Sequence, residues 1–160
     1  MRKQSKFLPW LIGLIVASLF FGMLLSIAAF EYSGTDDAPI LRSFMGYEGG
    51  APATFHLYLH TAFAWLLHGL AALFPTVAWF SVLQLFLLWL SEVVIVKSAV
   101  QLARRRKLGW WVGALGGASF LMLLTMYLSC RVSYTTTAAL CGAAAVAQLM
   151  SVDFTAERKR

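Results

Sequence analysis

The sequence predicts an all-α integral membrane protein with about four transmembrane helices, plus juxtamembrane or re-entrant helices in its first external loop. Of its 160 residues, 60% are hydrophobic and only 12% are charged, whereas about a quarter of a typical soluble domain is charged. The mean hydropathy is +0.74, and several apolar runs reach the roughly 20 residues that cross a bilayer. On length alone the chain is one membrane domain, residues 1–160.

The first predicted span covers residues 7–30. Arg2, Lys3 and Lys6 precede it, as basic residues also precede the apolar core of a signal peptide. That core is normally about 7–15 residues long, shorter than the run found here. We therefore expect an uncleaved first helix whose N-terminus is cytoplasmic.

A polar external loop with interfacial helices is predicted over residues 31–77. Asp37 stands before Ala38-Pro39, and its carboxylate can accept hydrogen bonds from the free amides of a helix start. The pattern predicts a short helix from there through Phe44 to about Gly46.

Residues 54–74 are long enough to span a membrane but carry three histidines. If this segment spans, five helices place the basic clusters 104–107 and 158–160 outside. If it lies in the outer interface or dips in and returns, every basic cluster faces the cytoplasm, as the positive-inside rule favours. We prefer the second topology, which predicts a multi-pass protein of the plasma (inner) membrane with both termini cytoplasmic.

Pro75-Thr76-Val77 breaks the chain before a second span over residues 78–99, with Trp79 as an interfacial anchor. Glu92 lies deep within this span. A charge at that depth is costly and normally faces a cavity or a partner, so Glu92 is either a relay group or a structural polar contact.

The third and fourth spans are predicted over residues 110–128 and 135–152. Small residues in both suit close helix packing: Gly113, Gly116 and Gly117 in the third, and Ala138, Ala139, Gly142 and Ala143–Ala145 in the fourth. The two cysteines, Cys130 and Cys141, form no disulfide or zinc pattern, and we expect them to be packing residues.

The external loop holds the candidate catalytic residues, Asp36 and Asp37. A carboxylate beside a membrane-facing cavity can act as a general base on a hydroxyl acceptor, or can help bind a divalent cation, Mg²⁺ or Mn²⁺. The alternative is a helix cap and a solvated acid. His56 and His60 have the i, i+4 spacing of metal ligands, but the sequence favours the polar edge of an interfacial helix, which His68 continues. We group His56 and His60 with the substrate-binding candidates.

Two arginines, Arg42 and Arg131, are the basic residues that this topology places outside. A guanidinium can bind a phosphate group through paired hydrogen bonds, so both are candidates for binding a phosphate at the outer leaflet. The alternatives are a surface pair with Glu48 or a lipid headgroup contact.

The chain resembles the N-terminal part of GT-C class membrane glycosyltransferases, in particular bacterial members related to lipid-sugar-dependent glucosyl- and mannosyltransferases. The residues that carry the resemblance are the first span, Thr35-Asp36-Asp37, Gly46-Tyr47-Glu48-Gly49, Pro52, His56, Leu73-Phe74-Pro75, Trp79 and Tyr134-Thr135-Thr136-Thr137-Ala138. The resemblance implies transfer of a sugar from a polyprenyl-phosphate carrier to an extracytoplasmic acceptor, with Asp36 or Asp37 as the family acid.

Members of that class carry about twice as many spans or more, so we expect this chain to act within a longer enzyme or with a membrane partner that supplies further helices. The expected partners are the bilayer and the lipid-linked sugar, and no nucleic acid. Two alternatives stay open: a non-enzymatic membrane subunit or scaffold, and a metal or solute carrier that uses His56, His60 and the acids.

Overall fold

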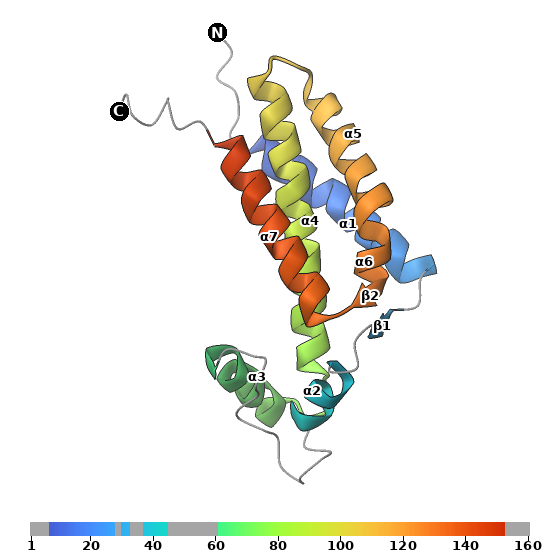
Figure 1. Cartoon of the computed structure of the whole chain (residues 1–160), viewed down its shortest axis with the longest axis vertical. Helices are drawn as coiled ribbons and strands as arrows, with labels where there is room; N and C mark the ends of the chain where they lie inside the picture. The colour runs from blue at the N-terminus through green and yellow to red at the C-terminus, as the bar shows by residue number, and fades with distance from the viewer. Residues whose placement is uncertain (1–6, 28–29, 33–36, 45–60, 153–160) are drawn as a thin grey trace, which may run out of the picture.

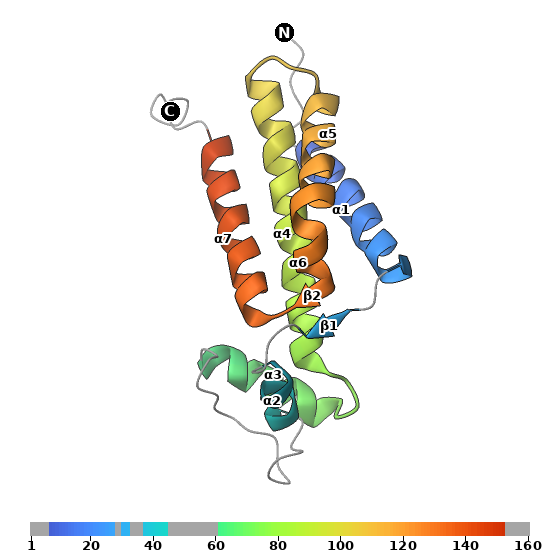
Figure 2. The same cartoon turned by 45° about the vertical axis from the view of Figure 1, so that its right-hand side comes forward.

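Four long helical segments pack together in the computed structural model, which describes residues 7–27, 30–32, 37–44 and 61–152. These segments are α1 (Leu8–Ile27), α4 (Trp79–Arg105), the continuous run α5 (Trp110–Phe120), η1 (Leu121–Thr125) and α6 (Met126–Cys130), and α7 (Tyr134–Ser151). Figures 1 and 2 show α4 in the middle, between α7 on one side and α1 and α5 on the other. The protein is an all-α membrane protein, as predicted.

Three of these segments, α1, α4 and the run 110–130, are long and apolar enough to cross a membrane. The predicted fourth span, α7, has 18 residues and lies alongside α4, but it is not among the three. Its three consecutive threonines and Gln148 lower its apolar content. Its length of about 27 Å still approaches the roughly 30 Å of a hydrocarbon core.

The helices alternate in direction along the bundle. Trp10 contacts Lys97 whereas Ser18 contacts Trp89, so α1 runs antiparallel to α4. The chain therefore enters α1, turns from α4 into α5 and leaves α7 at one end of the bundle, called here the basic end because it holds the turn 104–107 (Figure 1).

Two short helices, α2 (Asp37–Phe44) and α3 (Thr61–Leu73), lie across the opposite end, called here the cap end (Figures 1 and 2). Ile40 of α2, Ala64 and Leu67 of α3 and Phe80 of α4 are buried together, which fixes the cap to the start of α4. The helix α2 agrees with the predicted short helix. The described part of the segment 54–74 is a 13-residue helix, about 20 Å long and shorter than a bilayer core.

The chain breaks between α3 and α4 where Pro75 was expected to end a helix. The indole Nε1 of Trp79 donates to the carbonyl oxygen of Phe74 at 3.2 Å, and the two rings pack with centroids 6.1 Å apart. Trp79 thus closes this turn, in addition to its predicted place at the end of a span.

A two-residue parallel bridge that the sequence did not predict joins distant loops at the cap end. Strand β1 (Glu31–Tyr32) pairs with β2 (Arg131–Val132), with Glu31 opposite Arg131. This backbone contact ties the chain that leaves α1 to the connection between α6 and α7.

The glycines of α5 set the distance between α5 and α4. A Cβ at Gly113 would lie 2.7 Å from the carbonyl oxygen of Ala99, and one at Gly117 would lie 3.1 Å from Cα of Val96. The prediction of close contact is wrong for Gly116, because a Cβ there would meet no atom within 4 Å. One helix face packs on α4, and Gly116 lies off that face.

Most of the small residues that were predicted to pack tightly along α7 are not buried within this chain. Its buried residues are Thr137, Leu140, Ala144 and Ser151. Ala138, Ala139, Gly142, Ala143 and Ala145 are exposed. Of the predicted set only Ala144 is buried, and Ala143 lines a cavity between α4, α5 and α7.

Candidate functional site

The predicted catalytic and metal residues lie mostly in the part of the chain that the structure does not describe. Asp36, His56 and His60 are outside the described residues, and Asp37 is the first residue of α2. Among the residues that are described, no three His, Cys, Asp or Glu side chains gather as metal ligands.

The two predicted phosphate-binding arginines are both exposed at the cap end. Arg42 lies in the last turn of α2, where a cation interacts favourably with the helix dipole. The guanidinium of Arg131 lies over the ring of Tyr127, with its central carbon 5.1 Å from the ring centroid. The structure brings Arg131 to Glu31 through the backbone bridge, and it leaves both guanidinium groups on the surface.

A capping box fixes the turn that carries Arg131. Ser133 Oγ accepts from the Thr136 amide at 3.0 Å, and Thr136 Oγ1 accepts from the Ser133 amide at 3.1 Å. Thr136 Oγ1 also lies 3.2 Å from the carbonyl oxygen of Arg131, to which it can donate. Such reciprocal bonds satisfy amides that a helix start leaves free, so this turn is rigidly attached to α7.

The buried carboxyl group of Glu92 forms a second candidate site, in the interior of the bundle. Its side chain is 0% exposed. Ser129 Oγ donates to Glu92 Oε1 at 2.8 Å, whereas Glu92 Oε2 has no hydrogen-bond partner among the described residues. This oxygen can accept one more donor or carry a proton, so the contact with Ser129 is compatible with both predicted alternatives, a relay group and a structural polar contact.

The π-helical turn η1 lies directly before the segment that carries Ser129. Within it Thr125 is buried, and its Oγ1 donates to the carbonyl oxygen of Leu121 at 2.9 Å. A π turn inserts an extra residue into a helix and rotates the residues after it, and such turns are frequent at functional sites. Here the residues after the π turn are those of α6, which carries Ser129 and its hydrogen bond to Glu92 of α4.

Lys97 is the second charged side chain that is buried among the described residues, at 4% exposed. Its Nζ donates a hydrogen bond to Oε1 of Gln148 and lies 4.8 Å from the centroid of the Trp10 ring. Ser98 Oγ donates to the same Gln148 oxygen at 3.4 Å. An amide oxygen and an aromatic face together stabilise this ammonium group, which has no carboxylate partner among the described residues.

Polar pairs join α4 to α7 at a constant separation of fifty residues. Ser91 bonds to Cys141 at 3.3 Å, Ser98 to Gln148 at 3.4 Å and Ser151 to Gln101 at 3.2 Å. The two helices run in the same direction (Figure 1), and the steps of seven and three residues are those of a coiled-coil seam. Hydrogen bonds across such a seam fix the register of helices in a membrane.

Sequence reasoning missed this seam, although a signal for it is present. The polar positions 91, 98 and 101 repeat in the apolar run of α4 with the same spacing as 141, 148 and 151 in α7. When each polar residue of a span is considered separately, Glu92 stands out because it is charged. The repeat is found only when the polar positions of the two helices are compared. Cys141 is a free, half-buried thiol, in agreement with its predicted packing role.

The third histidine, His68, lies half-buried on α3, edge-on to Trp65 with centroids 6.4 Å apart. Its Nδ1 has no hydrogen-bond partner among the described residues. The position on a short helix of the cap fits the predicted polar edge.

Comparison with known proteins gives no further assignment. No protein-family model, no curated protein and no solved structure matches this chain.

Proposed function

We propose that this chain is a glycosyltransferase-like membrane module that takes part in transferring a sugar from a polyprenyl-phosphate carrier to an extracytoplasmic acceptor. In this proposal it acts within a longer or partnered enzyme. The cap end faces outward, the basic end and both termini are cytoplasmic, and the membrane is the plasma (inner) membrane.

One observation carries the proposal: α2 and α3 lie across the end of the bundle opposite the basic turn (Figures 1 and 2). The resemblance to the GT-C class implies interfacial helices of this kind in the first external loop. Since α2 begins at Asp37, this acid is at the same end as Arg42 and Arg131. This arrangement supports a candidate base or cation ligand on the same side as two groups suited to a lipid-linked phosphate.

A transfer assay tests the proposal directly. Membranes that contain the full chain and its partners are given radiolabelled polyprenyl-phosphate glucose or mannose, and label in acceptors is measured for the wild type, Asp36→Asn and Asp37→Asn. At least one variant should lose transfer by about a hundredfold or more, the effect of removing a general base. Asp153→Asn, an acid that follows α7 in the sequence, is the matched control. Full transfer by both loop variants would refute the proposal.

Cysteine labelling tests the orientation separately. Arg42→Cys should react with an impermeant thiol reagent in intact cells, and Lys107→Cys should react only after the membrane is opened. The reverse pattern would place the acids in the cytoplasm and remove the proposed reaction.

A second candidate, a non-enzymatic subunit or scaffold, is favoured by the outer face of α7. Ala138 and Gly142 lie exposed there, and small residues let a second helix approach closely. Crosslinking from Gly142→Cys to one defined membrane protein, without crosslinking from Leu19→Cys on the exposed face of α1, would support this role. The same result together with loss of transfer in the aspartate variants would identify the partnered enzyme.

A further inference from the structure

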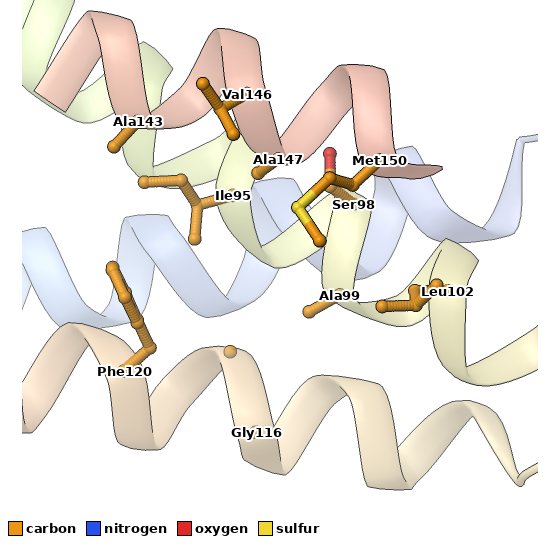
Figure 3. Close-up of a pocket in the computed structure, with 11 residues that line it drawn as sticks. Ile95, Ser98, Ala99, Leu102, Gly116, Phe120, Ala143, Val146, Ala147 and Met150 are labelled. Atoms are coloured by element: carbon orange, nitrogen blue, oxygen red, sulfur yellow. The ribbon is translucent and has the colours of Figure 1, made fainter. Parts of the chain in front are cut away.

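Two cavities on α4 and α5 meet to form one groove that is open to the surface. The first, about 500 Å³, lies between α4, α5 and α7, with Phe120 and Met150 projecting into it (Figure 3). The second, about 600 Å³, lies between α4 and α5 at the basic end and reaches Arg106. Both are lined by Ala99, Leu102 and Gly116, so the apolar surface continues from the basic turn into the bundle. We call it the α4–α5 groove.

The mouth of this groove is strongly basic. Arg106 and Lys107 are exposed, and neither has an ion-pair partner among the described residues. The carboxylate of Glu92 is buried inside the bundle and does not reach them. Arg105 is bound to the end of α7, through a hydrogen bond of 2.9 Å to the carbonyl oxygen of Val152. The mouth therefore presents two cations to any anion that lies at the groove.

Lys107 occupies a backbone position that favours glycine. The Leu108 amide donates to the Ala103 carbonyl at 2.9 Å and the Lys107 amide to the Arg104 carbonyl at 3.1 Å, the two bonds of a Schellman motif. Lys107 is its C′ residue, with a φ of 59°. A side chain there costs on the order of 1–2 kcal/mol relative to glycine, so the turn carries a charge at a position where glycine would stabilise the fold more.

Two tryptophans mark the depth of the mouth. Trp110 and Trp111, the first residues of α5, are 51% and 57% exposed, and exposed tryptophans concentrate at the headgroup level of a bilayer. The cations therefore lie at the interface, whereas Leu102, Gly116 and Phe120 lie deeper, within the apolar region. A ligand that fits both parts has an anionic head and a hydrocarbon chain.

We propose that the α4–α5 groove binds an anionic phospholipid, with its phosphate at Arg106 and Lys107 and an acyl chain along Leu102 and Gly116 toward Phe120. Basic pockets between transmembrane helices are suited to such headgroups. This site lies at the end of the bundle opposite the proposed sugar-transfer residues and does not depend on that function.

Lipid titration followed by native mass spectrometry tests the site on the full chain in detergent. Phosphatidylglycerol should bind more tightly than phosphatidylcholine. Arg106→Gln with Lys107→Gln should weaken phosphatidylglycerol binding about thirtyfold, from about fivefold for each charge near the surface. Gly116→Leu should also weaken it, because the new side chain enters open space on the groove wall.

Matched controls separate the groove from general effects. Arg2→Gln with Lys3→Gln removes the same charge at two residues that precede α1 in the sequence, and it should leave phosphatidylglycerol binding unchanged. Gly142→Leu adds the same side chain to open space on α7, outside the groove, and should also leave it unchanged.

Four results would overturn the proposal. Equal binding of phosphatidylcholine would show that the anionic headgroup plays no part. An equal loss of binding in the Arg2→Gln, Lys3→Gln variant would show that only net charge matters. Unchanged binding in Gly116→Leu would show that the lipid binds through its headgroup alone and that no acyl chain occupies the groove. Dissociation of a lipid-free dimer by Gly116→Leu would show that a second copy of the chain occupies the groove instead.

Discussion

Three glycines of α5 offer a graded test of how closely this segment packs on α4. Alanine in place of glycine within a helix stabilises it by about 0.5–1 kcal/mol, because the unfolded chain loses freedom. Against this gain stands the cost of forcing a methyl group into a packed contact, typically about 1–3 kcal/mol. The balance at each position depends on what the new Cβ would meet.

At Gly113 the Cβ would collide with the backbone of Val100 and lie 2.7 Å from the Ala99 oxygen. Backbone of a central helix cannot move aside cheaply, so Gly113→Ala should destabilise by about 1–2 kcal/mol net. At Gly117 the neighbours are atoms of Val96 at 3.1 to 3.2 Å, which need to give only slightly. Gly117→Ala should therefore be close to neutral. At Gly116 the space is open, and the substitution should stabilise by the helix term alone.

The assay is equilibrium unfolding in mixed detergent micelles, followed by helical circular dichroism. The expected order of unfolding free energies is Gly116→Ala highest, then Gly117→Ala, then Gly113→Ala, with about 2–3 kcal/mol between the extremes. If Gly113→Ala is as stable as Gly116→Ala, α5 does not pack on α4 in the manner described.

Three further substitutions probe the buried polar groups and the basic turn. Ser129→Ala should cost about 1–3 kcal/mol of unfolding free energy, because it leaves both oxygens of Glu92 without a partner; the cost should vanish in a Glu92→Met background, and persistence there would refute the pairing. Gln148→Leu should cost about 1.5–3 kcal/mol by removing the acceptor of the Lys97 ammonium group, measured by the same unfolding, with Lys97→Met as the rescuing second change. Lys107→Gly should raise the unfolding free energy by about 1 kcal/mol, because glycine adopts the left-handed conformation without a steric cost. The same substitution should weaken phosphatidylglycerol binding in the native mass spectrum. A lower unfolding free energy would contradict the idea that Lys107 is strained.

The sequence predicts most of the architecture because hydropathy, charge and proline act locally. The apolar runs, the break at Pro75 and the short helix after Asp37 each depend on neighbours in the chain. The basic clusters constrain the topology further, and the turn 104–107 lies at the end of the bundle where α1 begins and α7 ends.

The features that the sequence did not predict depend on contacts between segments far apart. The bridge between β1 and β2 joins residues a hundred positions apart, and the π turn at 121–125 follows from no local signal in hydropathy, charge or turn residues. Which of three glycines faces α4 depends on the rotation of α5, and composition alone cannot fix that rotation. The candidate site was predicted from residue types in the loop, and Asp36, His56 and His60 lie outside the residues that the structure describes.

Of the described helices, α4 has the most buried residues and also the most buried polar side chains, and the membrane explains this. In lipid an apolar side chain gains nothing by facing inward, so packing and interhelical hydrogen bonds decide which face is buried. On α1, accordingly, Leu19 and Leu25 point outward at 70% and 58% exposed, whereas Gly13 and Ala17 are buried. On α4 the polar groups face its neighbours, because each would be far costlier against hydrocarbon. The polar residues of a span therefore indicate its buried side, and on α4 they identify the central helix that the other three surround.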